Sequence, residues 1–346
     1  MVELTVAPRV QRAPHFLGGG RIGVRDRPVP EPGDGELLIE VRANALCGTD
    51  RHQLDSGSPV TPGHEVAGVV AAAGPATATA VGTPGVVYLM DVCGECRTCR
   101  AGATNQCLGK RADTGFTRDG GLGAWALVHE RQLFAIPADL PFAEATLLLD
   151  VMGTTGHAID RARRLRDDIE SVVVGGAGPI GLGAVAMSHL LLGPDVPVIV
   201  ADIVPFRLEL AATLGARTVD LRARSLGDGV RAAGIRGGAD LGIDGAGRTA
   251  ARRDILGVLG KRGVLVCIGH GEDLALDVSR DLIAPERAVL GSEYFRLDEL
   301  PRNLELLRSH RAELARIVTH RLPVAELERA FELFLSGATG KVVVEP

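Results

Sequence analysis

The pattern of apolar and polar positions changes near residue 152. Before this point, short runs rich in β-branched residues are separated by glycine and proline, which is typical of strands joined by turns. We predict a turn at 47–50 and a surface loop over 71–80. The predicted strands are 37–41, 66–70 and 86–90. The first part of the chain is therefore expected to be β-rich and irregular.

From about residue 153 the apolar runs alternate with stretches of helical spacing. Strands at 171–175 and 197–201 each lead into a helix, over 179–192 and 205–214 respectively. Strand–helix alternation predicts a doubly wound parallel sheet in an α/β domain. Further strands are predicted at 241–244, 264–268 and 288–290.

The end of the chain differs again. Helices are predicted at about 298–309 and 324–336, followed by a short strand at 341–344. We expect this tail to return to the first, β-rich part and to complete its domain.

Composition limits the classes of function. A chain of 346 residues with 46% hydrophobic and 23% charged residues can build about two domains with large cores. A net charge of −5 disfavours nucleic acid and anionic membranes as partners. Residues 1–4 lack the basic and apolar regions of a secretory signal, and no apolar run is long enough to span a bilayer. We therefore expect a soluble cytoplasmic protein.

A glycine motif follows the strand at 171–175. Gly176, Gly178 and Gly181 form G-x-G-x-x-G, with Pro179 and Ile180 between the last two glycines. In a strand–turn–helix unit this spacing lets the backbone approach a pyrophosphate at the N-terminus of the helix. The motif predicts a dinucleotide site.

Asp202 decides which dinucleotide is favoured. It closes the next strand about 20 residues after the last glycine, where an acid can bind the ribose hydroxyls and repel a 2′-phosphate. We therefore predict NAD as the cofactor. Arg207 lies either near the ribose or on a solvated helix face, and in the first position it would also allow NADP to bind. The tip of a later strand is expected near the nicotinamide, with His270 a neighbour of the cofactor rather than a catalyst. This tip comprises Ile268, Gly269 and His270.

Four cysteines are clustered in a lobe at about 91–110. They stand at C-x2-C-x2-C-x7-C spacing, which suits a closed tetrahedral zinc site that stabilises structure. An iron–sulfur cluster and unliganded thiols are the alternatives. The four are Cys93, Cys96, Cys99 and Cys107.

A second set of metal-binding side chains is spread along the chain. Cys47 and His64 offer a thiolate and an imidazole, and Asp150 ends an apolar run where the sheet domain begins. Such a set can hold Zn2+ with one position open for water or substrate. Glu65 is an alternative ligand, or one that exchanges with Asp150.

Together these motifs resemble the zinc-containing medium-chain alcohol dehydrogenase family. The resemblance extends from the Cys47 motif through 63–65, the cysteine lobe and the glycine turn to 339–343. It implies a GroES-like catalytic domain over 1–152 and 291–346, and a Rossmann domain over 153–290. The active site is then expected in the cleft between them.

The resemblance also implies roles for single residues. Cys47 and His64 match zinc ligands, and Asp150 stands where polyol, threonine and glucose dehydrogenases usually have glutamate. Asp50 matches the acid that orients the ligand histidine, and Thr154 matches a position lining the nicotinamide pocket.

A proton relay is implied as well. Thr49 and His52 match the residues that pass the proton of the substrate hydroxyl to solvent while hydride moves to the nicotinamide. Without that role, Thr49 would be a turn-forming hydroxyl and His52 a solvated loop histidine. The family implies two zinc ions per chain and a homodimer or homotetramer.

The substrate is least constrained. Residues 115–121 resemble the corresponding stretch of 2-deoxy-scyllo-inosamine dehydrogenases, and 53–60 is shorter than in such relatives, which predicts an open pocket. We expect a secondary alcohol of a polyol, sugar or aminocyclitol. A zinc-free quinone or enone reductase, or a non-catalytic NAD- and zinc-binding protein, are the alternatives.

Overall fold

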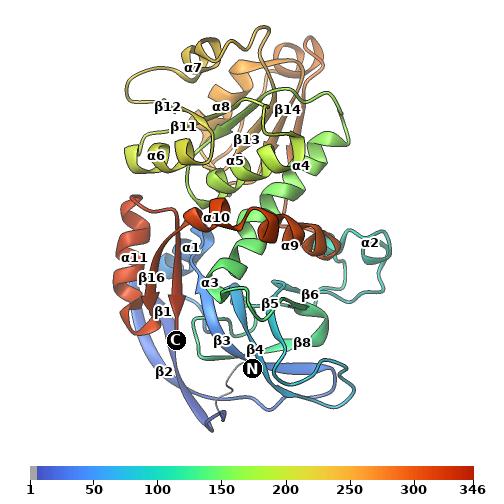
Figure 1. Cartoon of the computed structure of the whole chain (residues 1–346), viewed down its shortest axis with the longest axis vertical. Coiled ribbons are helices and arrows are strands. Elements are labelled where there is room, and N and C mark those ends of the chain that lie inside the picture. The colour runs from blue at the N-terminus through green and yellow to red at the C-terminus, as the bar shows by residue number, and fades with distance from the viewer. Residues whose placement is uncertain (1–5) are drawn as a thin grey trace.

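The computed structural model describes residues 6–346, so the residues considered for a secretory signal lie outside the described part. Two sheets dominate the molecule, one in each half of Figure 1. Within residues 6–346, none of the helices combines the length and the apolar character needed to cross a bilayer.

The upper half holds a six-stranded sheet in which all neighbouring strands are parallel. The strand order is β12-β11-β10-β13-β14-β15, so the chain reverses its direction of winding beside β10. This confirms the predicted doubly wound sheet. Its strands are β10 (Val172–Gly175), β11 (Val198–Asp202), β12 (Arg217–Asp220), β13 (Ala239–Asp244), β14 (Leu259–Cys267) and β15 (Ala288–Gly291).

Helices connect these strands and cover the sheet (Figure 1). The predicted 179–192 helix is α5, whose first turn carries Pro179, a residue that fits there because it needs no N–H partner. The predicted 205–214 helix, α6, ends one residue early. The helices of this half are α4 (Thr155–Arg163), α5 (Pro179–Leu192), α6 (Pro205–Thr213), α7 (Leu226–Ala232) and α8 (Thr249–Val258).

The lower half holds a seven-stranded sheet of order β16-β17-β3-β4-β5-β9, with β8 also pairing with β3. The C-terminal strand returns to this sheet, where Val343 of β17 lies opposite Ala45 of β3. Its strands are β3 (Glu36–Ala45), β4 (Glu65–Ala73), β5 (Pro84–Val87), β8 (Trp125–His129), β9 (Leu133–Ala135), β16 (Val318–Pro323) and β17 (Lys341–Glu345).

Shorter elements surround this sheet. Two small antiparallel pairs are β1 (Val10–Gly18) with β2 (Arg21–Pro28), and β6 (Met90–Asp91) with β7 (Ala112–Asp113). The remaining helices are α1 (Gly48–Ser56), α2 (Arg97–Arg100), α3 (Phe142–Ala145), α9 (Leu300–Ser309), α10 (Arg311–Leu314) and α11 (Leu327–Ser336).

Three local predictions for the first part of the chain were wrong. The turn expected at 47–50 opens helix α1, and the loop expected from 71 begins only after β4 ends at Ala73. The strand expected over 86–90 is interrupted, because β5 ends at Val87 and β6, which pairs with β7 instead of β9, begins only at Met90.

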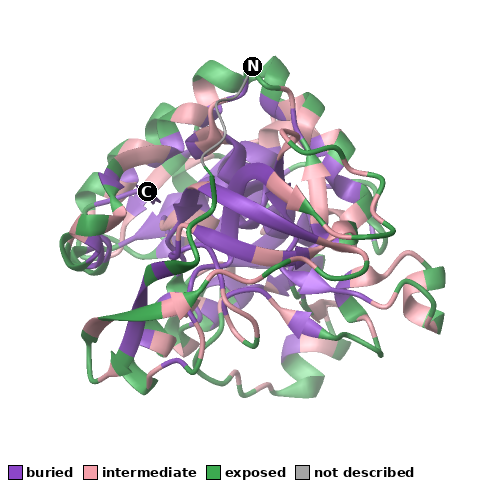
Figure 2. Cartoon of the chain, turned by 90° about the horizontal axis from the view of Figure 1, so that it is seen from below, coloured by how far each residue is buried: buried purple, intermediate pink, exposed green. Residues whose placement is uncertain are grey.

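One apolar core joins the two halves. Buried residues of the lower sheet, such as Ala67 and Val86, belong to the same cluster as Val172 and Val200 of the upper sheet. Buried strands fill the centre of the molecule in Figure 2, while exposed residues lie on the outer helices and loops. This shared core holds the two sheets together and supports the loops between them.

Candidate active site and cofactor site

Cys47 lies between β3 and α1. Its main-chain N–H donates to Asp50 Oδ2 at 2.8 Å, so the start of the helix fixes the position of the thiol. The side chain of Cys47 is buried, and Asp50 is fully buried beneath it. Local sequence alone therefore places the thiol, because the partner that holds it is only three residues away.

His64 directly precedes β4, and glycines from its own segment and from 115–121 pack closely together beside it. Gly63 has φ +100, and a Cβ atom on Gly120 would stand 2.0 Å from the Gly63 carbonyl oxygen. The glycines of 115–121 thus allow this segment to pack against Gly63, which brings the Phe116 ring to 5.0 Å from the His64 ring. Phe116 is a wall of the site that the sequence analysis missed.

Asp150 opens a π-helical turn, Asp150–Thr154, directly after the apolar run that precedes it. Its Oδ2 lies 3.0 Å from Cys47 Sγ and 3.4 Å from His64 Nε2. On the other side of the imidazole, His64 Nδ1 lies 3.2 Å from Asp50 Oδ1. Three segments far apart in the sequence therefore bring a thiol, an imidazole and a carboxylate together, all of them buried.

Glu65 belongs to the same cluster but has a partner of its own. One ligand atom from each of Cys47, His64, Glu65 and Asp150 lies within 4.8 Å of the others. The carboxylate of Glu65 forms a fully buried ion pair with Lys341 of β17. The sequence analysis missed Lys341, which stood only within the 339–343 motif.

Electrostatics in this cluster suit a cation. Burial lowers the pKa of His64, but the carboxylates of Asp50 and Asp150 raise it well above its ordinary value. Burial and the nearby Asp150 charge also raise the pKa of Glu65 well above its usual range, although Lys341 opposes this rise. The sulfur, nitrogen and oxygen donors fit Zn2+, which binds all three ligand types.

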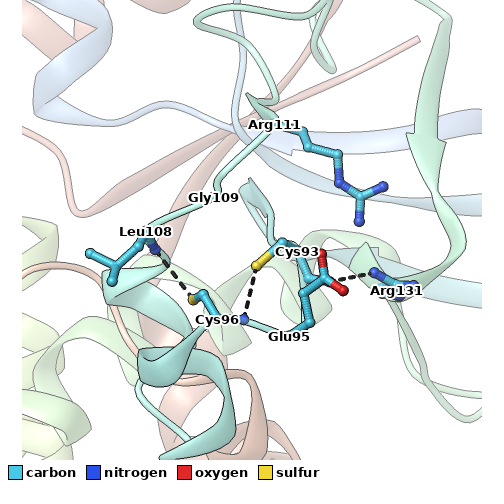
Figure 3. Close-up of a pocket in the computed structure, with 7 residues that line it drawn as sticks. All are labelled: Cys93, Glu95, Cys96, Leu108, Gly109, Arg111 and Arg131. Carbon is cyan, nitrogen blue, oxygen red and sulfur yellow. Dashed lines mark hydrogen bonds between the residues drawn. The ribbon is translucent and has the colours of Figure 1, made fainter.

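The four clustered cysteines form a second donor set. One sulfur atom from each lies within 4.8 Å of the others, and none of the six cysteines in the described chain is in a disulfide. Main-chain N–H groups point at the sulfurs, as from Leu108 to Cys96 at 3.4 Å. Figure 3 shows this contact and the Arg131 side chain, which donates to the Cys93 carbonyl at 2.8 Å.

The glycine turn has the shape that the motif requires. Gly176 has φ +89, and a Cβ atom on Gly181 would stand 1.8 Å from the Gly176 carbonyl oxygen. Gly178 caps α5, whose first residues are Pro179 and Ile180. The N-terminus of this 14-residue helix therefore faces the carboxyl edge of the sheet, where pyrophosphates bind.

Asp202 and Arg207 flank this turn. Asp202 accepts hydrogen bonds from the N–H groups of Ala177, Ile203 and Val204, at 2.6 to 2.9 Å. Arg207 is half-buried, and its Nε donates to the Thr339 carbonyl at 3.4 Å. The guanidinium also lies 3.7 Å from where a Cβ of Gly178 would stand, so it faces the glycine turn.

The other predicted residues are placed around the two sites. Thr154 is buried in the turn that Asp150 opens, and Thr49 Oγ1 lies 3.5 Å from His64 Nε2. His52 is exposed, further along α1. Ile268 is buried just after β14, whereas the His270 side chain is 66% exposed and lies 3.5 Å from Glu293.

Arg252 was also missed by the sequence analysis. Its guanidinium pairs with Asp244 Oδ2 at 2.6 Å and donates to the Gly269 carbonyl at 2.6 Å. Asp244 in turn accepts from the N–H of Gly247 at 2.9 Å. This buried pair joins the ends of β13 and β14 and shapes the loop that carries Gly269 and His270.

Two family profiles match the chain. The profile of the alcohol dehydrogenase GroES-like domain covers residues 33–138, and that of zinc-binding dehydrogenases covers 179–309. An L-threonine 3-dehydrogenase of Alteromonas mediterranea is 31% identical over 94% of this chain and 96% of its own. The chain belongs to the zinc-dependent medium-chain alcohol dehydrogenase family.

Other relatives agree with this assignment. An L-threonine 3-dehydrogenase of Shewanella frigidimarina is 30% identical over 92% of this chain and 94% of its own. A zinc-binding dehydrogenase of Sinorhizobium meliloti 1021, solved with NADP, is 30% identical over 97% of this chain and 99% of its own, with a TM-score of 0.85.

Membership of the medium-chain alcohol dehydrogenase family confirms several predictions. The protein is an oxidoreductase that acts on CH–OH donors with zinc and a nicotinamide dinucleotide. The GroES-like and Rossmann architecture is confirmed as well. The roles of individual residues and the domain boundaries remain predictions.

Proposed function

We propose that this protein oxidises a secondary alcohol of a polyol, sugar or aminocyclitol to a ketone, reversibly and with NAD. The observation that carries the proposal is the meeting of Cys47, His64 and Asp150 beside a sheet built for a dinucleotide. A buried thiol, imidazole and carboxylate at this place serve no evident packing purpose. They suit an open zinc site that faces the cofactor.

We propose Cys47, His64 and Asp150 as the catalytic zinc ligands. Asp150 is preferred to Glu65 because its oxygen contacts both other donors, whereas the charge of Glu65 is neutralised by Lys341. Asp50 holds the far nitrogen of His64 and thereby orients the imidazole. When bound, zinc would supply Lewis-acid polarisation of the substrate hydroxyl.

Thr49 and His52 provide a route for the hydroxyl proton. Thr49 stands on the first turn of α1 with its hydroxyl near His64, where it can accept the proton. His52 lies on the exposed side of the same helix and can release that proton to solvent. The position of Thr154 behind Asp150 suits contact with the nicotinamide.

The preference for NAD rests on Asp202. Its carboxylate is fixed by three main-chain donors at the end of β11, where a 2′-phosphate would meet a negative charge. The positive charge of Arg207 beside the glycine turn would reduce this repulsion of a 2′-phosphate. The Sinorhizobium relative was solved with NADP. The ratio of kcat/KM for NAD to that for NADP measures the preference directly.

Substrate, location and assembly complete the proposal. The relatives named as L-threonine 3-dehydrogenases act on a small polar alcohol. The short segment 53–60 favours an open pocket for such a substrate, and Phe116 would form one wall of it beside His64. We place the protein in the cytoplasm as a homodimer or homotetramer, without nucleic-acid or membrane partners.

Zinc content and one substitution test the mechanism. The purified protein should hold about two zinc ions per chain, as its two donor sets require. Cys47→Ala should lose one of them and nearly all alcohol oxidation, while calorimetry still detects NAD binding. Cys267→Ala, a cysteine outside both donor sets, is the control that should keep both ions. Alcohol oxidation by Cys47→Ala at the wild-type rate would refute the mechanism.

A further inference from the structure

Glu293 stands at the carboxyl edge of the six-stranded sheet, the edge that also carries the glycine turn after β10. It follows β15 by two residues, and His270 follows the neighbouring parallel strand β14 by three. Ligands of open α/β sheets bind at the carboxyl ends of the strands, where both residues lie. His270 Nε2 and Glu293 Oε2 are 3.5 Å apart.

The backbone at Glu293 is held firmly. Asn105 Nδ2 donates to the Glu293 carbonyl at 2.7 Å, and Asn105 also lies 3.4 Å from His157 Nε2. His157 in turn contacts Glu299 at 2.9 Å, and all three supporting side chains are buried. The cysteine lobe and helix α4 thus fix where the Glu293 side chain begins.

The segment after Glu293 runs against the turn that carries Asp150. A Cβ atom on Gly153 would stand 2.4 Å from the ring of Phe295. The Tyr294 hydroxyl accepts the Leu89 N–H at 3.3 Å, which fixes the segment from its other side. Glu293 is therefore anchored beside the donor cluster while its own side chain remains 48% exposed.

The charge of Glu293 is not required by the fold. Its one ion-pair partner within residues 6–346 is His270, and so exposed a pair contributes little to stability. Neighbouring charges have other partners: Lys110 pairs with Asp113 at 2.6 Å, and Lys341 pairs with Glu65. A half-exposed carboxylate thus faces solvent at this edge, and its partner His270 is itself exposed, so Glu293 can also accept hydrogen bonds from a cation.

We propose that Glu293 binds an ammonium group of the substrate, so that the preferred substrates are amino alcohols. The inference rests on the proposed function, and it selects the amine-bearing class among polyols, sugars and aminocyclitols. Charge-assisted hydrogen bonds from an ammonium to this carboxylate would place the neighbouring hydroxyl toward Cys47 and His64. Glu293 would then determine specificity without taking part in hydride transfer.

Two matched pairs of probes test this role. 1-Amino-2-propanol differs from 1,2-propanediol, and trans-2-aminocyclohexanol from trans-1,2-cyclohexanediol, only by an ammonium in place of a hydroxyl. Glu293→Gln should lower kcat/KM for the amines by about tenfold or more, mainly through KM, and leave the diols within about twofold. Glu293→Asp should restore part of the amine preference, and Glu332→Gln, an exposed acid on α11, should change nothing.

Calorimetric titration of the NADH-bound enzyme with the same probes measures binding alone, so it tests the role of Glu293 even where no probe is oxidised. Amine binding that Glu293→Gln weakens by about tenfold supports the role of Glu293 even if no probe is oxidised, which would refute only the proposed function. The inference would be overturned if Glu293→Gln lowered kcat/KM equally for amines and diols. It would also be overturned if the wild type and Glu293→Gln bound the amines with equal affinity.

Discussion

Lys341 shows how one residue can decide between two candidate ligands. Its ammonium is fully buried against Glu65, and the charges of Glu65, Cys47 and Asp150 raise its pKa although burial lowers it. Glu65 is thereby supplied with a counter-charge and does not need a metal for neutralisation. Lys341 acts on Asp150 only at longer range, and the Asp150 carboxylate contacts the thiol and the imidazole.

Removal of this lysine should destabilise the protein. Lys341→Met leaves the Glu65 charge buried without a partner, which should cost about 3–5 kcal/mol of unfolding free energy in urea denaturation. The double variant Lys341→Met/Glu65→Gln removes both charges and should recover most of that loss. A single variant less than about 1 kcal/mol below the wild type would show that the pair is not needed.

At the scale of elements, the cysteine lobe depends on its thiols. The segment between β6 and β7 contains only the four-residue α2 and one short 3-10 turn, Thr104–Gln106. So little regular structure buries little apolar surface, and a bound metal can supply the missing cross-links. The pKa of Cys96 is lowered to about 5, chiefly by its contact with the Thr98 hydroxyl, which favours the thiolate.

Loss of one thiol should therefore destabilise the cysteine lobe over 91–110 while the rest of the fold stays intact. Cys99→Ser is expected to remove one zinc ion per chain and to open the segment over 91–110 to limited proteolysis, with a lower melting temperature. Mass spectrometry of the fragments locates the cleavage, and Cys267→Ser serves as the matched control. Wild-type zinc content in Cys99→Ser would contradict a zinc site made by the four cysteines.

For the whole molecule, we propose the β15 edge of the six-stranded sheet as the surface through which copies of the chain would pair. β15 is an edge strand whose apolar residues Ala288, Val289 and Leu290 are only partly buried. An edge strand offers unpaired main-chain groups to a second copy of the chain.

Light scattering after size exclusion should detect this assembly. A mass of two or four times the 36.2 kDa chain is expected, and Val289→Lys should lower it by placing a charge on the edge strand. An unchanged mass for Val289→Lys would place the interface elsewhere. A wild-type mass of 36.2 kDa would contradict the proposed oligomer.

The sequence by itself determined the features that depend on near neighbours. The glycine turn, the four cysteines and the Cys47–Asp50 start of α1 are short-range patterns, since each needs partners only a few residues away. The strand–helix alternation likewise fixed the parallel sheet, because apolar periodicity reports burial directly.

Only the tertiary structure decided what depends on distant segments. Lys341 lies 276 residues from Glu65, Asp150 lies 103 from Cys47, and Glu293 lies 188 from the Asn105 that holds it. No local spacing encodes such meetings, because they arise when the C-terminal strand and the segment after β15 pack against the first sheet. Long-range packing therefore brought the donor cluster together and gave Glu65 its ion pair with Lys341.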